Sequence, residues 1–180
     1  MENLTKKVGS SKQSKSYLSE IYSAERRPIT DYPLKLVKHL KENYLHSQET
    51  KNISVLDVGC GRGDVLKSFK EIGYDVAGID LSEEAIKLCE PIEVRQINIE
   101  KDYDINNYEK KFDIIFSKSL IEHLIQPIKF FEYCKKMLSF LRIPYMPMYE
   151  GLTNIKWPNE INKYLRHSNE VMLFCIYKFK

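Results

Sequence analysis

Carboxylates and glycines gather around one short stretch of this chain, and their types and spacing favour a site for a nucleoside-containing cofactor. Asp57 and Asp64 bracket a loop in which every second residue is glycine, and Asp80 closes the next apolar run. Glycine permits positive φ and lets a ligand approach the main chain closely. The free N–H groups of a helix that begins here would point at that ligand. The glycines are Gly59, Gly61 and Gly63.

Asp80 has the spacing of an acid that accepts hydrogen bonds from ribose hydroxyls. It follows Gly59 by 21 residues, close to the about 20 expected in a nucleotide-binding βαβ unit. The apolar run Ile53–Val58 precedes the glycines, an amphipathic helix pattern follows them, and a second apolar run, Val76–Ile79, ends at Asp80. This order of elements predicts that the loop and the acid lie together at the carboxyl edge of a parallel sheet.

The glycine spacing separates two classes of cofactor. Dinucleotide-binding enzymes carry Gly-x-Gly-x-x-Gly, whereas here the third glycine, Gly63, comes one residue early and Asp64 stands in its place. Asp57 and Asp64 would repel a pyrophosphate, and burial would strengthen that repulsion. A cofactor that carries a sulfonium and an ammonium group suits two carboxylates better. An NAD-dependent dehydrogenase is therefore the weakest of the interpretations that stay open.

The stretch Asp57–Gly63 resembles the first motif of class I S-adenosylmethionine-dependent methyltransferases (type 11/12-like domain). The resemblance continues through Gly78–Ser82 and through Phe112–Leu124, which is similar to the family's fourth strand and the loop beyond it. Together these matches extend over about residues 30–141 in order and spacing. They imply an α/β, Rossmann-like parallel sheet flanked by helices, S-adenosylmethionine as the cofactor, and methyl transfer as the activity.

The resemblance assigns roles to the matching positions of this sequence. Asp57 and the loop 59–63 would hold the methionine end of the cofactor, and Asp80 would hold the ribose hydroxyls. Leu81 would pack beside the adenine, with Asn98 near it, and Ser117 and Lys118 would line the methyl-transfer side. The predicted cofactor-binding residues are Asp57, Gly59, Cys60, Gly61, Gly63, Asp80, Leu81, Asn98 and Ser117.

Several of these positions also have a purely structural interpretation. Asn98 is equally well explained as a strand-end residue, and an ordinary loop explains Ser117 and Lys118 somewhat better than direct chemistry does. Cys60 is interpreted as a small packing residue inside the loop, not as a nucleophile. His123 and Lys118 are the candidates for a catalytic role, with packing beside the site as the alternative for His123.

Hydrophobic periodicity predicts the elements that position these residues. A short helix over 16–24 is expected either to close over the cofactor, as in the family, or to pack in the core. Further helices are expected after Asp31, Gly63, Ser82 and Pro127, the last with an apolar stripe through Ile128, Phe131, Cys134, Leu138 and Leu141. The predicted strands are 53–58, 76–79, 92–98 and 112–116.

Composition is that of an ordinary soluble protein with one domain. Of its 180 residues 43% are hydrophobic and 29% charged, and the net charge of +3 is too small to argue for nucleic acid. No apolar run is long enough for a membrane span, and the N-terminus is polar. The four cysteines are widely spaced, without a Cys-x-x-Cys pair. This spacing argues against a metal site and a disulfide framework and indicates a cytoplasmic location.

The C-terminal part departs from the family pattern. Ile143–Pro147 carries two prolines, which exclude a central strand, and only Val171–Tyr177 is strand-like. We therefore expect a sheet that is incomplete at its C-terminal strands. Its apolar edge beside the fourth strand is expected to be covered weakly by Val171–Tyr177, or left open to self-association. The expected organisation is a flexible N-terminus over 1–14, an S-adenosylmethionine-binding domain over 15–141 and an atypical segment over 142–180.

Two functions follow from these patterns. The first is a methyltransferase whose acceptor is a small molecule or a sugar, in which the protein aligns the reactants and the cofactor supplies the chemistry. The second is a non-catalytic or truncated module that binds S-adenosylmethionine and has lost the acceptor half. No motif in the chain identifies the acceptor.

Overall fold

A six-stranded sheet with strand order β3-β2-β1-β4-β6-β5 forms the centre of the molecule. The computed structural model describes residues 18, 23, 25–45, 50–101, 111–138, 145–149 and 172–177. β1 pairs in parallel with β2 and β4, and β2 pairs in parallel with β3. This confirms the predicted Rossmann-like parallel sheet. The strands are β1 (Ser54–Val58), β2 (Asp75–Asp80), β3 (Val94–Gln96), β4 (Ile114–Lys118), β5 (Tyr145–Tyr149) and β6 (Met172–Tyr177).

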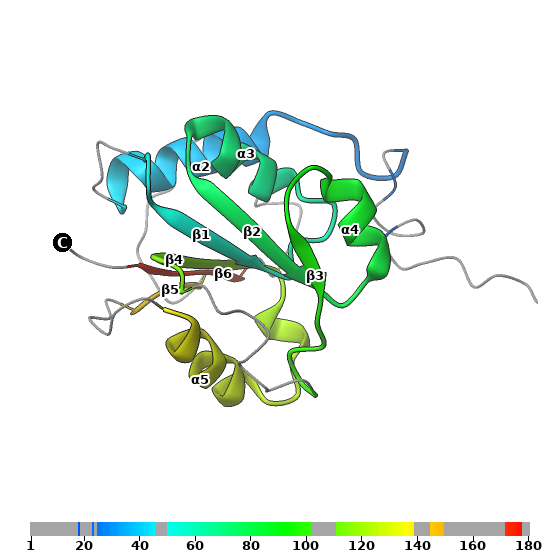
Figure 1. Cartoon of the computed structure of the whole chain (residues 1–180), viewed down its shortest axis with the longest axis vertical. Coiled ribbons are helices and arrows are strands. Elements are labelled where there is room, and N and C mark those ends of the chain that lie inside the picture. Colours follow the sequence, from blue (N-terminus) through cyan, green and yellow to red (C-terminus); the bar gives the residue numbers. More distant parts are fainter. Residues whose placement is uncertain are drawn as a thin grey trace, which may run out of the picture.

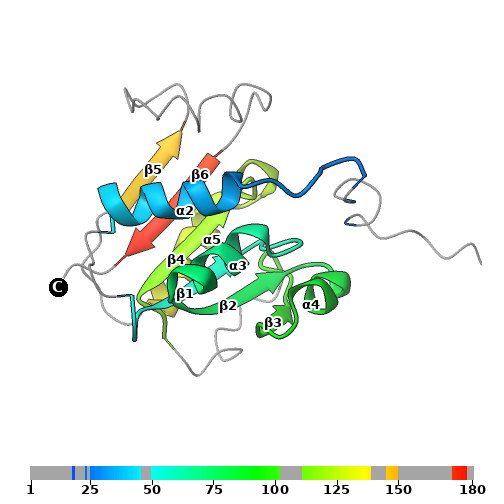
Figure 2. The same ribbon diagram turned by 90° about the horizontal axis from the view of Figure 1, so that it is seen from above.

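Helices lie on both faces of this sheet (Figures 1 and 2). On one face, α2 (Tyr32–Asn43) and α3 (Asp64–Ile72) lie side by side, and α4 (Glu83–Cys89) packs beside β3. The opposite face carries α5 (Pro127–Met137), which follows the short 3-10 helix η2 (Ile121–His123). The core beneath α2 and α3 joins helix and strand side chains, namely Leu36, Val37, Leu40, Phe69, Val55, Ile114 and Phe116.

Local signals explain where these helices begin and end. Ser82 precedes α4, and its hydroxyl accepts a hydrogen bond from the backbone N–H of Glu84 at 3.3 Å. Gly73 ends α3 with a φ of 104°, a left-handed conformation that favours glycine at the C-terminus of a helix. Asp31 occupies the N-cap position of α2, but its carboxylate makes an ion pair with Lys35 at 2.9 Å and no capping hydrogen bond.

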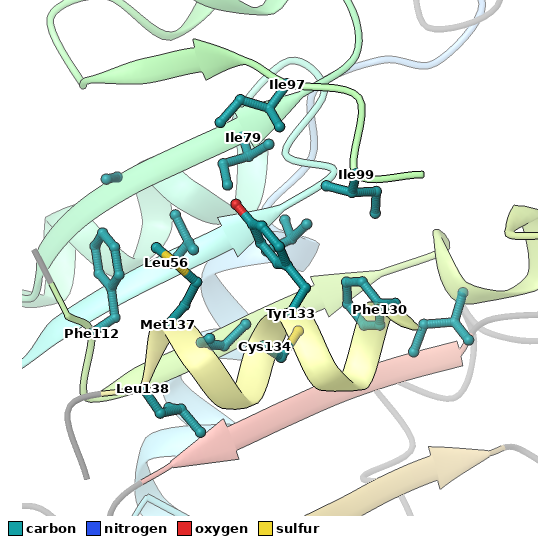
Figure 3. Close-up of a cluster of buried hydrophobic side chains, with 14 residues drawn as sticks. Leu56, Ile79, Ile97, Ile99, Phe112, Phe130, Tyr133, Cys134, Met137 and Leu138 are labelled. Atoms are coloured by element: carbon teal, nitrogen blue, oxygen red, sulfur yellow. The ribbon is translucent and has the colours of Figure 1, made fainter. Parts of the chain in front are cut away.

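The buried face of α5 closes the second side of the sheet (Figure 3). Phe130, Tyr133, Cys134 and Met137 point from the helix towards the strands, where Leu56 and Ile79 are among the residues that they meet. These four positions follow helical spacing, and they define the side of the helix that faces the sheet.

The predicted apolar stripe of α5 is wrong at Ile128. This side chain is 74% exposed, because residues two positions apart on a helix point in nearly opposite directions and Phe130 faces the sheet. Cys134 and Leu138 are buried as the stripe predicts. The predicted extension of the helix to Leu141 lies outside the described residues.

The far edge of β4 is covered by a C-terminal hairpin. β6 pairs antiparallel with β4 from Ile114 opposite Tyr177 to Lys118 opposite Leu173, so the strand predicted over Val171–Tyr177 is confirmed. The parallel part of the sheet therefore ends at β4, in agreement with the missing fifth-strand pattern.

Our expectation that no strand forms around Pro147 is wrong, since β5 pairs antiparallel with β6. β5 lies at one edge of the described sheet, with β3 at the other. A proline fits an edge strand because its missing N–H can face away from the neighbouring strand and break no ladder bond. The two prolines therefore excluded a central strand but not this one.

The predicted helix over 16–24 and the flexible segment 1–14 lie outside the described residues, apart from Leu18 and Ser23. Leu18 is assigned to a helix and is 4% exposed. Across the part of the chain that the structure describes, no helix has both the length and the apolar character needed to span a membrane.

Candidate functional site

The carboxyl ends of β1 and β4 meet where the strand order reverses, because β2 and β3 extend the sheet to one side and β4 to the other. Open α/β sheets bind ligands in the crevice at such a switch point. The glycine loop follows β1, Asp80 ends β2, and Ser117 and Lys118 end β4. The topology therefore brings these predicted residues to the same edge of the sheet.

The loop from Gly59 to Gly63 turns the chain from β1 into α3. Gly59, Gly61 and Gly63 have φ of 79°, 54° and 75°, in the left-handed region that favours glycine. The N–H groups of Gly59 and Cys60 donate to the carbonyl of Ile79 in β2 at 2.8 and 3.1 Å. A Cβ on Gly63 would lie 2.5 Å from Sγ of Cys89. Conformation and space thus both require glycine at this position.

Asp80 links the glycine loop to the turn after β2. One carboxylate oxygen accepts from the N–H of Gly61 at 2.8 Å, and the other accepts from the N–H of Ser82 at 2.8 Å. A carboxylate has further lone pairs, so these two bonds leave capacity for hydroxyl donors from a ligand. Asp80 is only partly buried, which leaves it accessible at the strand end.

Asp57 is the buried acid of the site. Asp57 is 3% exposed. It lies in β1, opposite Gly78 of β2 and Phe116 of β4. Burial, followed by the charges of Cys89 and Asp80, raises the pKa of Asp57 to about 8, against the opposing effect of Lys118. A bound cation would favour its ionised form, so this carboxyl fits a positively charged ligand group.

Asp64 contributes less to the charge of the site than the sequence argument assumed. Its carboxylate pairs with the guanidinium of Arg62 at 2.5 Å. The same guanidinium donates to the carbonyl of Arg27 at 2.8 Å, which ties the loop to the segment before α2. Asp64 therefore gives little support to the expectation that the loop repels a pyrophosphate.

Ser117 is completely buried, and its hydroxyl donates to the carbonyl of Val58 at 2.9 Å. This bond joins the ends of β1 and β4 just beyond their last paired residues, Asp57 and Phe116. The ammonium of the next residue, Lys118, lies 5.8 Å from the centre of the Tyr32 ring at the start of α2. Ser117 thus holds the crevice in shape, and Lys118 lies beside it.

The other predicted residues of the site are Leu81, Asn98 and His123. Leu81 directly follows Asp80 and is 64% exposed, so its side chain is free to receive a flat ring. The side-chain oxygen of Asn98 accepts a hydrogen bond from the N–H of Glu100 at 3.0 Å. His123 ends η2 and is exposed.

Three residues that the sequence interpretation did not assign to the site border the glycine loop. A Cβ built on Gly59 lies 3.1 Å from the Leu120 side chain, and one on Gly61 lies 3.8 Å from Leu18. Cys89, at the end of α4, lies against Gly63. No local pattern in the sequence indicated these contacts, because the three residues come from segments far from the loop along the chain.

The family model for a methyltransferase domain matches residues 25–141. The chain therefore belongs to this family, the class I S-adenosylmethionine-dependent methyltransferases. The alternative of a dehydrogenase is not supported. The match covers the glycine loop, Asp80 and the segment after β4, which are the parts of the fold described above.

Known proteins agree with this assignment. An enzyme named ubiquinone biosynthesis O-methyltransferase from Coxiella burnetii is 33% identical over 113 residues, which are 59% of this chain and 48% of that protein. The chain thus spans about half the length of such curated relatives.

Two solved structures share the fold. The magnesium protoporphyrin IX methyltransferase of Synechocystis PCC 6803, with bound SAM, has a TM-score of 0.54 and 12% identity, covering 82% of this chain and 80% of that one. A TehB-like SAM-dependent methyltransferase from Corynebacterium glutamicum has a TM-score of 0.54 and 14% identity, covering 88% and 92%.

Proposed function

We propose that this chain binds S-adenosylmethionine at the carboxyl ends of β1, β2 and β4 and transfers its methyl group to a hydroxyl oxygen of a small-molecule acceptor. The observation that carries the proposal is the buried carboxyl of Asp57 beneath a left-handed glycine loop. This acid fits the cationic methionine end of the cofactor. Bound S-adenosylmethionine would supply a methyl group attached to a positively charged sulfur. When the methyl group is transferred, the electrons of the sulfur–carbon bond stay on the sulfur.

Different residues of the chain bind different parts of the cofactor in this proposal. The backbone of 59–63 lets the cofactor approach closely, and Asp80 accepts from the ribose hydroxyls while its bonds to Gly61 and Ser82 fix its orientation. Leu81 offers an exposed apolar surface for the adenine. Asn98 stays a candidate for the adenine side through its amide nitrogen. Within the proposed organisation, 15–141 is the cofactor-binding unit and 142–180 contributes the hairpin strands.

The acceptor side lies at the end of β4, with Ser117 and Lys118, and in the segment that follows it, with His123. An oxygen acceptor loses its proton as the new carbon–oxygen bond forms, and His123, exposed at the end of η2, is our candidate to receive it. His123→Ala should then lower kcat and leave the affinity for S-adenosylhomocysteine unchanged. A loss of affinity without a change in kcat would assign His123 to packing instead.

An oxygen acceptor is supported by the 33% identical relative, which is named an O-methyltransferase. A panel of hydroxylated aromatic compounds and sugars, assayed by release of S-adenosylhomocysteine, tests this part of the proposal. Turnover of amines alone would contradict it. A location in the cytoplasm is part of the same proposal and is supported by the described cysteines, which are free.

A non-catalytic module that binds S-adenosylmethionine is the second candidate. The observation that favours it is the direct pairing of β4 with antiparallel β6, which ends the parallel sheet at four strands. Cofactor binding without turnover of any acceptor in the panel would support this candidate.

Calorimetric titration with S-adenosylmethionine, S-adenosylhomocysteine and NAD tests the binding that both candidates share. We expect both adenosyl ligands to bind more tightly than NAD. Tighter binding of NAD in the same buffer would contradict the proposed site.

A further inference from the structure

Lys118 borders the crevice on the side away from the proposed cofactor residues. It is the last residue of β4, and β4 and β2 lie on opposite sides of β1. The glycine loop, which follows β1, and Asp80, which ends β2, are the parts that we assign to the cofactor. A side chain at the end of β4 is therefore placed where a second substrate would meet the cofactor.

The half-buried side chain of Lys118 contacts two neighbours. Its ammonium lies 5.8 Å from the centre of the Tyr32 ring at the start of α2, within the range of a cation–π interaction. The ammonium also donates to the hydroxyl of Ser119 at 3.5 Å. Because an ammonium carries three N–H donors, it can bind a ligand and keep its contact with Ser119.

Ser119 has a backbone conformation that is unusual for a residue other than glycine. Its φ is 55°, in the left-handed region. The next residue, Leu120, packs against the glycine loop, since a Cβ built on Gly59 would lie 3.1 Å from its side chain. Strained residues of this kind gather at functional sites. Here the strained residue is the one whose hydroxyl meets Lys118.

The charges of the crevice favour an anionic group beside Lys118. The ammonium of Lys118 opposes the rise in the pKa of Asp57, so its field reaches the acid that we place at the cofactor. Bound S-adenosylmethionine would add a sulfonium and an ammonium to the same crevice. Positive charges repel one another strongly in a partly buried site. A carboxylate at Lys118 would offset this repulsion and accept a charge-assisted hydrogen bond.

We propose that Lys118, positioned by Ser119 and Tyr32, binds a carboxylate of the methyl acceptor, so that the chain prefers hydroxylated carboxylic acids to their neutral analogues. This inference rests on the proposed function and specifies the substrate class of that site. Lys118 is then a binding residue that stays protonated, and the proton of the acceptor hydroxyl is left to His123. The methionine part of the cofactor, which also ends in a carboxylate, is the other source of such an anion.

The test compares carboxylic acids with their amides as acceptors for the full chain, because an amide has nearly the same shape but no charge. The probes are protocatechuate and its amide, and glucuronate and its amide, assayed by release of S-adenosylhomocysteine. For at least one pair we expect kcat/KM to be at least about tenfold higher for the acid. Lys118→Met should remove this preference by lowering kcat/KM for the acid, whereas Lys118→Arg should retain part of it.

Two further variants separate binding from general effects of charge and structure. Ser119→Gly keeps a residue that tolerates the left-handed conformation and removes the hydroxyl, so it should lower the preference for the acid without a loss of stability in urea. Lys70→Met is the matched control for charge. Lys70 is exposed in the last turn of α3, at the end away from the glycine loop, and its variant should keep the preference.

Calorimetric titration with S-adenosylhomocysteine and with methylthioadenosine, which lacks the amino-acid part, distinguishes the two sources of the carboxylate. Lys118→Met should change both affinities by the same factor. A selective loss of S-adenosylhomocysteine affinity would assign Lys118 to the cofactor carboxylate and overturn the inference. Methylation of neither acid, equal kcat/KM for acids and amides, or a preference that survives in Lys118→Met would overturn it as well.

Failure of this inference and failure of the proposed function give different results. A chain that binds no adenosyl ligand contradicts the proposed function. A chain that binds S-adenosylhomocysteine and methylates neutral acceptors without a preference for acids contradicts only the assignment of Lys118.

Discussion

The backbone N–H of Gly61 donates a hydrogen bond of 2.8 Å to the carboxylate of Asp80, so the turn after β1 is fastened to the end of β2. The second oxygen of this carboxylate accepts from the N–H of Ser82 at 2.8 Å. One acid therefore orders two turns at the edge where we place the cofactor. This arrangement gives Asp80 a structural role besides its proposed contact with ribose.

Asp80→Ala should lose on the order of 1.5–3 kcal/mol of S-adenosylhomocysteine binding, or roughly 10- to 100-fold in affinity, because charge-assisted hydrogen bonds to the ribose disappear. Calorimetric titration measures this loss. Asp75→Ala is the matched control, since Asp75 is exposed at the opposite end of the same strand, and it should bind like the wild type. Equal affinities for wild type and Asp80→Ala would place the ribose acceptor elsewhere.

The unliganded protein should lose stability between about pH 6 and pH 8 by roughly 2 kcal/mol through Asp57. Burial, its largest cause, raises the pKa of this carboxyl from an ordinary value of 3.8 to about 8. With a folded pKa above the unfolded one, its contribution to stability is complete below the unfolded pKa. That contribution is lost as pH rises through the folded pKa.

Urea unfolding of Asp57→Asn at both pH values tests this, because the variant should lack that decline. Asp75→Asn is the control and should keep it. Parallel pH profiles for the wild type and Asp57→Asn would refute the assignment. Since a cationic ligand needs the carboxylate, affinity for S-adenosylhomocysteine should also rise over this range in the wild type and in Asp75→Asn, but not in Asp57→Asn.

Ser117→Ala should destabilise the protein by about 1–3 kcal/mol, because the buried carbonyl of Val58 would lose its hydrogen-bond donor. The midpoint of urea unfolding measures the change. Ser68→Ala offers a contrast, since Ser68 is also buried but bonds the carbonyl of Asp64 within its own helix. Alanine favours that helix, so the effect should be much smaller. Similar losses for the two variants would argue against a special role for the link between β1 and β4.

Glu100→Ala should loosen the beginning of α5. The Glu100 carboxylate accepts from the N–H of Ile125 at 2.5 Å and from that of Gln126 at 3.3 Å, in the segment just before α5. Loss of such a hydrogen bond costs about 0.5–1.5 kcal/mol. Amide hydrogen exchange should become faster at residues 125–130. Glu132→Ala, at an exposed position of the same helix, should leave the exchange there unchanged, and unchanged exchange in Glu100→Ala would contradict the prediction.

Much of the parallel sheet was predictable because its signals are local. Apolar runs, capping residues and glycines at fixed spacing predicted β1, α3, β2 and α4 with bounds close to the observed ones. The three loop glycines adopt the positive φ that their spacing implied. The same reasoning failed at Ile128, since a stripe of apolar residues does not show which of two overlapping helix faces meets the sheet.

The sequence by itself determined the family, the cofactor loop and the acid at the end of β2, because these depend on residues close together in the chain. Only the tertiary structure decided that Cys89 meets Gly61, that Glu100 binds the segment before α5, and that β6 covers β4. Glu100 and Ile125 lie 25 residues apart in the chain, and Gly61 and Cys89 lie 28 residues apart. Their pairing depends on strand order and helix packing, which no local pattern encodes.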